Sequence, residues 1–143
     1  MARRTLLDFF EDLARIDADF VVYDDGYRVR TFTYGEVAAL ARQFAARLRD
    51  ARIGPDQKVV LWSENRAEWL AVLWGCLLEG AVVVPVDYRS APEFVAHIAD
   101  IVDAKAIVVG GTVGTLDVAR PVWPIHHSAF SIQPSALPFL PQP

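Results

Sequence analysis

The chain has 143 residues, of which 53% are hydrophobic and 22% are charged, and its formal net charge is −4 with a pI near 5.3. Length and composition predict one globular domain, with or without a tail, and exclude a disordered or low-complexity chain. The acidic balance argues against nucleic-acid binding, and the single cysteine excludes an internal disulfide framework and favours a reducing cytoplasm.

Helical patterns begin at places where a capping residue is followed three positions later by an acid, which satisfies free backbone N–H groups. These pairs are Thr5 with Asp8, Thr33 with Glu36, Asn65 with Glu68, and Ser90 with Glu93. Each pair leads into an apolar stripe of helical period, so the sequence predicts four helices. The second is expected to stop at Gly54. The third, from about Arg66 to Glu79, is apolar nearly all round, which predicts that neighbours cover most of it.

Two kinds of strand are expected between these helices. Residues 20–23 and 28–32 flank an Asp-Gly turn and predict a β-hairpin. Apolar runs without alternation, typical of parallel strands buried on both faces, occupy residues 58–62, 81–85 and 106–109. The expected fold class is therefore α/β, a parallel doubly wound βαβαβ layer preceded by an N-terminal helix and the hairpin. The apolar stretch at residues 69–86 is too interrupted for a membrane span, which needs about 20 apolar residues.

The last part of the chain differs in composition. Residues 121–143 carry no formal charge and hold six of the nine prolines, together with many apolar side chains. Prolines at this density predict an irregular segment. We therefore expect a domain at residues 1–115 and a proline-rich apolar tail at residues 116–143, with the tail lying extended against another surface.

Ligands in α/β folds bind beyond the carboxyl ends of the strands, so the turns that follow the strands are candidate sites. These turns are Ser63–Arg66, Asp87–Ser90 and Gly110–Gly114. The glycine turn matches neither a dinucleotide fingerprint nor a P-loop, so an ordinary loop is expected there. Arg66 either binds an anion beside the cap Asn65 or is simply solvated, and solvation is favoured. Asp87 either serves as a catalytic acid or shapes its turn, and the turn is favoured.

Other reactive side chains give no recognisable site. Cys76 lies in an apolar helix and is expected to be a buried, inert thiol. His126 and His127 are adjacent and far in sequence from His97, which disfavours a metal site. The serines at 63, 90 and 128 lack a nucleophile elbow, and the tryptophans are expected in the core. The sequence thus predicts no catalytic, cofactor-binding or metal-binding residue.

Several segments, in order and at the right spacing, resemble the opening of the adenylate-forming enzymes, which include acyl-CoA synthetases and peptide-synthetase adenylation domains. The segments are residues 33–36, 48–60, 65–69, 80–87, 90–94 and 104–109. The resemblance covers about residues 5–109 and implies that these segments are scaffold.

Enzymes of that family activate a carboxylate with ATP and Mg²⁺ to an acyl-adenylate, and a thiol, often coenzyme A, then takes the acyl group. Their phosphate-binding loop resembles Thr-Ser-Gly-Thr-Thr-Gly-x-Pro-Lys-Gly, and no such run occurs in this sequence. The Thr-Gly-Asp segment that holds the ribose and the lysine of the mobile C-terminal domain are also missing. The resemblance therefore implies an N-terminal portion truncated before the phosphate-binding loop, which binds no ATP, Mg²⁺ or coenzyme A alone and is inactive.

Two alternatives remain open at this point. The chain could be a non-catalytic interaction module that docks on a partner, such as the missing remainder of a ligase supplied in trans. It could also be a small nucleotide-binding protein, although the glycine turn is a poor phosphate loop. An exposed sheet edge or the apolar tail would also permit self-association.

Overall fold

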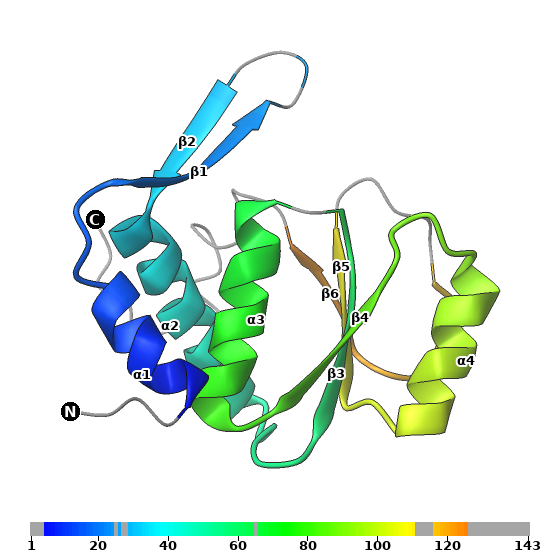
Figure 1. The fold of residues 1–143 in the computed structure, drawn as a ribbon. Coiled ribbons are helices and arrows are strands. Elements are labelled where there is room, and N and C mark those ends of the chain that lie inside the picture. The colour runs from blue at the N-terminus through cyan, green and yellow to red at the C-terminus, as the bar shows by residue number, and fades with distance from the viewer. Residues whose placement is uncertain (1–4, 25, 27–28, 65, 111–115, 126–143) are drawn as a thin grey trace.

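The structure, a computed structural model, describes residues 5–24, 26, 29–64, 66–110 and 116–125. Helices and strands alternate along most of the chain (Figure 1). Their bounds are α1 Leu6–Leu13, β1 Asp19–Asp24, β2 Val29–Thr33, α2 Tyr34–Asp50, β3 Lys58–Trp62, α3 Ala67–Glu79, β4 Val82–Val86, α4 Pro92–Val102, β5 Ala106–Gly110 and β6 Val122–Ile125. No helix among the described residues combines the length and hydrophobicity needed to cross a membrane.

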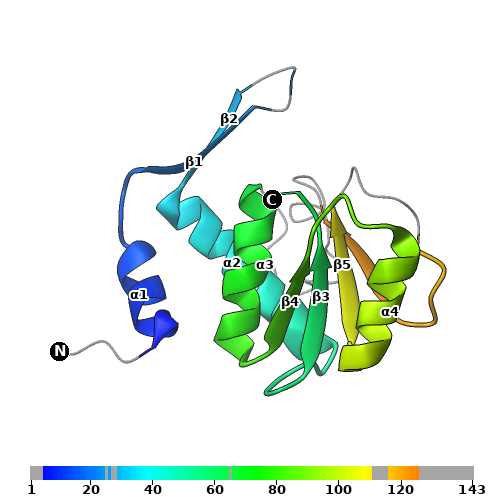
Figure 2. The same ribbon diagram turned by 45° about the vertical axis from the view of Figure 1, so that its right-hand side comes forward.

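The body of the molecule is a parallel sheet with the strand order β4-β3-β5-β6. Val60 of the inner strand β3 pairs with Val84 on one side and with Ile107 on the other. The chain therefore leaves β3 toward one edge for β4 and returns past β3 to form β5. Helices α2 and α3 lie on one side of the sheet and α4 on the other (Figure 2). The predicted doubly wound α/β layer is confirmed.

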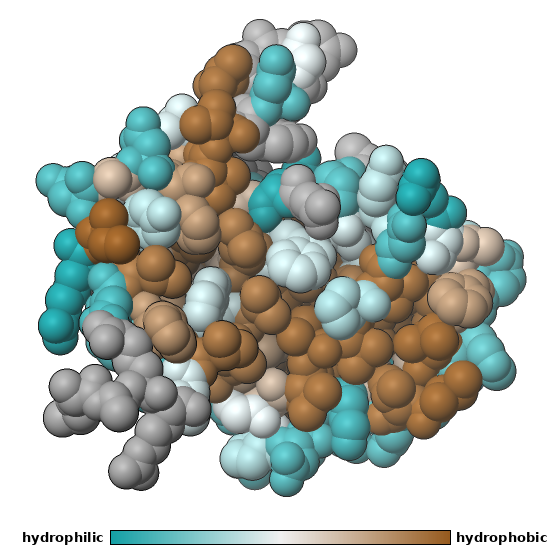
Figure 3. Space-filling view, in the orientation of Figure 1, coloured by the Kyte–Doolittle hydropathy of each residue, from teal (hydrophilic) through white to brown (hydrophobic). Residues whose placement is uncertain are grey.

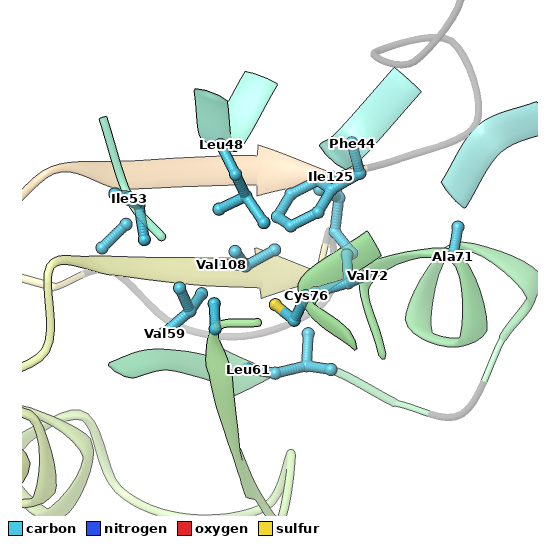
Figure 4. Packing of buried hydrophobic residues seen from close by; sticks show 12 residues of the cluster. Phe44, Leu48, Ile53, Val59, Leu61, Ala71, Val72, Cys76, Val108 and Ile125 are labelled. Atoms are coloured by element: carbon cyan, nitrogen blue, oxygen red, sulfur yellow. The ribbon is translucent and has the colours of Figure 1, made fainter. Parts of the chain in front are cut away.

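Alternate residues of the inner strands enter two separate cores. Val59 and Leu61 of β3 pack toward α2 and α3, whereas Val60 and Trp62 pack toward α4. Figure 4 shows the first core, where Leu48 and other side chains from α2 lie over the strands. All five residues of β5 are buried, which is the burial expected of an apolar strand without alternation.

Helices α2 and α3 approach each other closely at a glycine. A Cβ added to Gly75 would lie 2.9 Å from the backbone oxygen of Ala41 and 2.9 Å from the ring of Phe44. Only a residue without a side chain fits there, so the close approach of the two helices depends on glycine at position 75. Six residues of α3, including Glu68, are buried, which confirms that neighbours cover much of this helix.

The predicted helix starts are right for α1 and α2. Thr33 caps α2 in a reciprocal box: its Oγ1 accepts from the Glu36 N–H at 3.1 Å, and Glu36 Oε1 accepts from the Thr33 N–H at 3.1 Å. The predicted starts are wrong by one residue for the others, because Arg66 caps α3 and Ala91 caps α4. In α4 the reason is Pro92, which occupies the first helical position and holds the preceding residue in an extended conformation. Asn65 lies outside the described residues.

The hairpin of β1 and β2 forms as predicted, and its strands are antiparallel. Gly26 in its turn has a φ of 89°, and its N–H donates to Asp24 Oδ1 at 2.9 Å. The hairpin is joined to the body through Phe20, whose ring stacks on Tyr34 at 4.2 Å, and through Phe32, which is 5% exposed.

The expectation that the chain is irregular from residue 116 onward is wrong at its start. Residues 122–125 form β6, which pairs in parallel with β5. Pro124 is tolerated because β6 is an edge strand: the Ile107 N–H donates to the Pro121 oxygen at 2.9 Å, and strand alternation turns the backbone nitrogen of Pro124 away from β5. Ile125 is 1% exposed and belongs to the first core. Residues 126–143 of the predicted tail lie outside the described residues.

Candidate functional site

A cavity of about 320 Å³ opens where β3 and β4 end. Because these parallel strands are neighbours, their carboxyl-terminal turns meet at the same edge of the sheet. The turn after β3 contributes Ser63, and α3 contributes Trp69. The end of β4 and the turn that follows it contribute the remaining lining residues, namely Pro85, Val86, Asp87, Tyr88 and Arg89. Two of the turns predicted as sites are thus brought together.

Ser63 is 4% exposed and is held from two sides. Its hydroxyl donates to the backbone oxygen of Glu64 at 2.9 Å. From the neighbouring strand β5, Gly110 approaches so closely that an added Cβ would lie 2.4 Å from Ser63 Oγ. The first residue of the predicted glycine turn therefore lies beside the hydroxyl oxygen of this serine, whereas residues 111–114 of that turn lie outside the described residues.

Asp87 shapes its turn, as favoured from the sequence. Its Oδ1 accepts from the Arg89 N–H at 2.9 Å, and its Oδ2 accepts from the Arg89 guanidinium at 3.0 Å. The hydrogen bonds and charge of Arg89 lower the pKa of Asp87, and the carboxylate in turn raises the pKa of Arg89. The two side chains are 52% and 75% exposed, so this pair neutralises itself at the mouth of the cavity.

The expectation that Arg66 is solvated is wrong. Its side chain is only 13% exposed and lies between two carboxylates, with Nε 3.4 Å from Glu64 Oε1 and 4.0 Å from Glu68 Oε2. Glu68 is 4% exposed, and a buried carboxylate of this kind requires a nearby cation. The guanidinium therefore compensates charge within the protein, and the alternative that it binds an anion has no support from this arrangement.

The remaining candidate side chains lie apart from the cavity. Cys76 is fully buried in the first core, as expected, and burial raises the pKa of its thiol to about 12. His97 is exposed on α4, while His126 and His127 lie outside the described residues. Over the described ranges, no three His, Cys, Asp or Glu residues gather as metal ligands.

Two cavity residues have no clear signal in the sequence. Trp69 is expected in the core with the other tryptophans, but it is only partly buried and one side lines the cavity. Tyr88 belongs to a candidate turn without a role of its own, and it is 47% exposed. The signal that could have revealed them is position: each lies within a few residues of a strand end at the ligand-binding edge.

The described residues that line the cavity include no nucleophile paired with a base. The hydroxyl proton of Ser63 is donated to a backbone carbonyl, and the carboxylate of Asp87 is bound by arginine. Acyl or phosphoryl transfer needs an activated nucleophile or a set of donors aimed at developing charge. The lining offers instead two aromatic rings, a proline and one buried hydroxyl, which is a surface for binding.

Comparison with known proteins gives one consistent relationship. A family model described as AMP-binding enzyme matches residues 10–136. YngI of Bacillus subtilis, named as an acyl-CoA synthetase, is 34% identical over 93 residues, which are 65% of this chain and 17% of YngI. The nonribosomal peptide synthetase sirP of Leptosphaeria maculans is 33% identical over 86 residues, which are 60% of this chain and 4% of that protein.

Solved structures agree in fold. Klebsiella oxytoca NpsA, in complex with 3-hydroxyanthranilyl-AMSN, superposes with a TM-score of 0.72 at 19% sequence identity. The match covers 92% of this chain and 26% of that one. At this identity the superposition shows the fold alone. The chain spans less than a third of the length of each of these three proteins.

Proposed function

Because the chain belongs to the AMP-binding enzyme family, we propose that it forms the N-terminal scaffold of an ATP-dependent acyl-activating ligase. The whole enzyme would convert a carboxylate and ATP to an acyl-adenylate and pyrophosphate, and would then transfer the acyl group to a thiol such as coenzyme A. The 143 residues alone are inactive in this proposal, and they bind no ATP, Mg²⁺ or coenzyme A.

The observation that carries the proposal is the extent of the match. The family model matches residues 10–136, and one sheet contains every described strand of the body from β3 to β6. This agreement supports the proposal that the chain is a folded part of a ligase.

The charges around the cavity support inactivity of this part alone. A triphosphate needs cations and backbone donors around it. Arg66 is bound by two carboxylates and Arg89 by one, so the described residues of this edge do not fit ATP. The sequence also lacks a Gly-Lys-Ser/Thr run and the family's threonine- and glycine-rich loop.

Pyrophosphate exchange tests the inactivity directly. The purified chain is mixed with ATP, Mg²⁺, labelled pyrophosphate and a panel of aliphatic and aromatic carboxylates. Exchange is expected at the level of a blank without protein for every carboxylate. Exchange above the blank that depends on one carboxylate would show that the chain is a complete adenylating unit.

A chimera tests the scaffold role. The segment of YngI that matches this chain is replaced by the corresponding residues of this chain, and the chimera is assayed for adenylation. We expect activity to be retained with the carboxylate preference of YngI, since a scaffold does not select the acyl group. The matched control carries Leu61→Asp, which places a charge in the fully buried centre of β3 and should abolish folding and activity together. A soluble, folded chimera without activity contradicts the proposal.

An interaction module remains a second candidate, and the surface favours it. The face shown in Figure 3 carries much apolar surface. Val82 of β4 and Phe94 and Ile101 of α4 are 42%, 51% and 64% exposed. Apolar area of this kind marks an interaction surface. YngI lacking the matching segment, mixed with this chain, distinguishes the two candidates: adenylation restored by mixing shows docking in trans, and adenylation only in the chimera shows a covalent part.

A further inference from the structure

The cavity at the ends of β3 and β4 has no task in the proposed scaffold function, yet its size is that of a binding site. Its volume is about 320 Å³. Small-molecule sites in proteins start at roughly 300 Å³, and an engineered cavity of roughly 150 Å³ holds benzene. The space therefore suits one substituted ring.

The charges of the lining select for a neutral ligand. Among its described lining residues, Asp87 and Arg89 carry charge, and they bind each other at 3.0 Å and 3.2 Å. An anion would have to take Arg89 away from Asp87, and a cation would have to take Asp87 away from Arg89. Each exchange loses a charge-assisted hydrogen-bond pair, whereas a neutral molecule leaves it intact.

The walls offer flat apolar surface. Trp69 from α3 and Tyr88 from the turn after β4 supply aromatic rings, and Pro85 and Val86 supply aliphatic contacts. The guanidinium of Arg89 lies 5.7 Å from the centre of the Tyr88 ring, which restrains that ring although it is exposed. Aromatic rings held in place favour a planar aromatic partner.

The buried hydroxyl of Ser63 gives the cavity a direction. Ser63 uses its hydroxyl proton on the Glu64 carbonyl, so its oxygen retains lone pairs that accept a hydrogen bond. Ser63 is 4% exposed, and a Cβ on Gly110 would lie 2.4 Å from its Oγ, so a glycine at position 110 leaves room beside this oxygen. A ligand group that meets this oxygen must therefore be a donor.

We propose that this cavity binds a small, neutral aromatic ring carrying one hydrogen-bond donor, the chemistry of a phenol, with the donor on Ser63 and the ring between Trp69 and Tyr88. The inference does not rest on adenylation, and it holds or fails independently of the proposed function. It also differs from carboxylate binding, because a carboxylate is an anion and lacks the donor.

Titration followed by amide and indole N–H chemical shifts tests the proposal on the full 143-residue chain, with phenol as the probe. We expect saturable shifts confined to the amides of Ser63 and Tyr88 and to the amide and indole N–H of Trp69. Benzoate and benzylamine, of similar size but charged, should give no saturable shift at the same concentrations. Anisole, which cannot donate, should bind about fivefold more weakly than phenol, the factor expected for one net hydrogen bond.

Variants assign the contacts. Ser63→Ala should remove the difference between phenol and anisole, while Tyr88→Ala should weaken both. Phe94→Ala is the matched control, because Phe94 is similarly exposed, at 51%, but lies on α4 outside the cavity lining, and it should leave both affinities unchanged. Three results would each overturn the proposal. They are phenol shifts that do not saturate, benzoate binding as tight as phenol binding, and a loss of phenol affinity in Phe94→Ala equal to that in Tyr88→Ala.

Discussion

The two edge strands of the sheet, β4 and β6, are alike in backbone and opposite in surroundings. Each is a short parallel strand with one neighbour among the described strands, and each contains a proline. In β4 two of five residues are exposed and none is buried, whereas β6 ends in Ile125, which is 1% exposed within the first core. The difference arises from α2, whose side chains cover β6 on one face.

The cover over β6 is specific. The ring of Phe44 meets that of Trp123 edge to face at 6.1 Å, and the guanidinium of Arg47 lies 4.4 Å from the centre of the Trp123 ring. No comparable aromatic pair involves β4 among the described residues. An edge strand in this fold is therefore part of the core only where a helix reaches beyond the last inner strand.

The largest expected effect is on β6. Ile125→Ala removes a side chain from a closed core and should lower the free energy of unfolding by about 3 kcal/mol. Val86→Ala truncates the last residue of β4, which is only partly buried, and should cost less than about 1 kcal/mol. Urea unfolding of both variants and of the parent chain measures how much free energy of unfolding each substitution removes. Equal losses would mean that the edges are equivalent and that β6 is not part of the core.

The sequence predicts the interior better than the edges. Apolar runs locate the inner strands β3 and β5 to within one residue, because burial on both faces leaves a local signal. The run at residues 81–85 locates β4 equally well, but its expected burial on both faces is wrong, because β4 is an edge strand without a buried residue. Pro124 conceals β6, since a proline excludes an inner strand but not an outward-facing position on an edge. Whether a strand is inner or outer depends on topology, which the local pattern does not contain.

The candidate site is predictable from the sequence only where its residues have a local signal. Ser63 and Asp87 are candidates because they follow strands, and the topology brings them to one cavity. The burial of Arg66 between Glu64 and Glu68 has no local signal, because charged residues at a helix start usually face water. Trp69 is missed because an aromatic residue in an apolar helix has the same local pattern in a core and at a cavity wall.

A second substitution tests the cover supplied by α2. Arg47→Ala removes the cation over Trp123 and should lower the free energy of unfolding by about 1 kcal/mol, since the guanidinium is partly desolvated there. The matched control on the same helix is Arg49→Ala, whose side chain is 59% exposed and pairs with Glu79 at 2.7 Å. A surface pair of this kind contributes at most about 0.5 kcal/mol. If the two variants unfold alike, the Trp123 contact does not stabilise β6.

A smaller, pH-dependent effect is expected at the segment that leads into β6. Arg120 donates to Asp103 Oδ1 at 3.2 Å, to Asp100 Oδ1 at 3.1 Å and to the Ala104 oxygen at 2.7 Å, which ties the segment to the end of α4. Hydrogen bonds from Arg120 and then Lys105 lower the pKa of Asp103 below its usual 3.8. A carboxylate with a lowered pKa stabilises the fold above the unfolded value and loses this contribution as the pH falls through the folded value.

Arg120→Ala should therefore lower the melting temperature at pH 7, and the gap to the parent chain should narrow as the pH falls below about 4. Lys105→Ala is the comparison, because the Lys105 ammonium pairs with Asp103 at 3.3 Å, and its loss should open a smaller gap that narrows over the same range. Melting curves between about pH 7 and pH 3 give both gaps. A constant gap for Arg120→Ala would assign its effect to the uncharged contact with Ala104.

The smallest effect on stability, and the sharpest on association, is expected from the prolines themselves. The Val82 N–H donates to the Gln57 oxygen at 2.8 Å, toward β3, so strand alternation turns the backbone nitrogen of Pro85 outward, as it does for Pro124 in β6. Each proline thus removes a donor from the free side of its edge, which hinders pairing with another chain.

Pro85→Val restores that donor beside the exposed Val82 and should raise the weight-average mass more steeply with concentration than in the parent chain. Pro124→Val restores a donor on β6, whose face α2 already covers. Less apolar surface is available there than at β4, so Pro124→Val should cause less association than Pro85→Val. Sedimentation of both variants at matched concentrations measures their association. Equal association would show that the backbone donor alone, and not the cover over the strand, controls pairing at these edges.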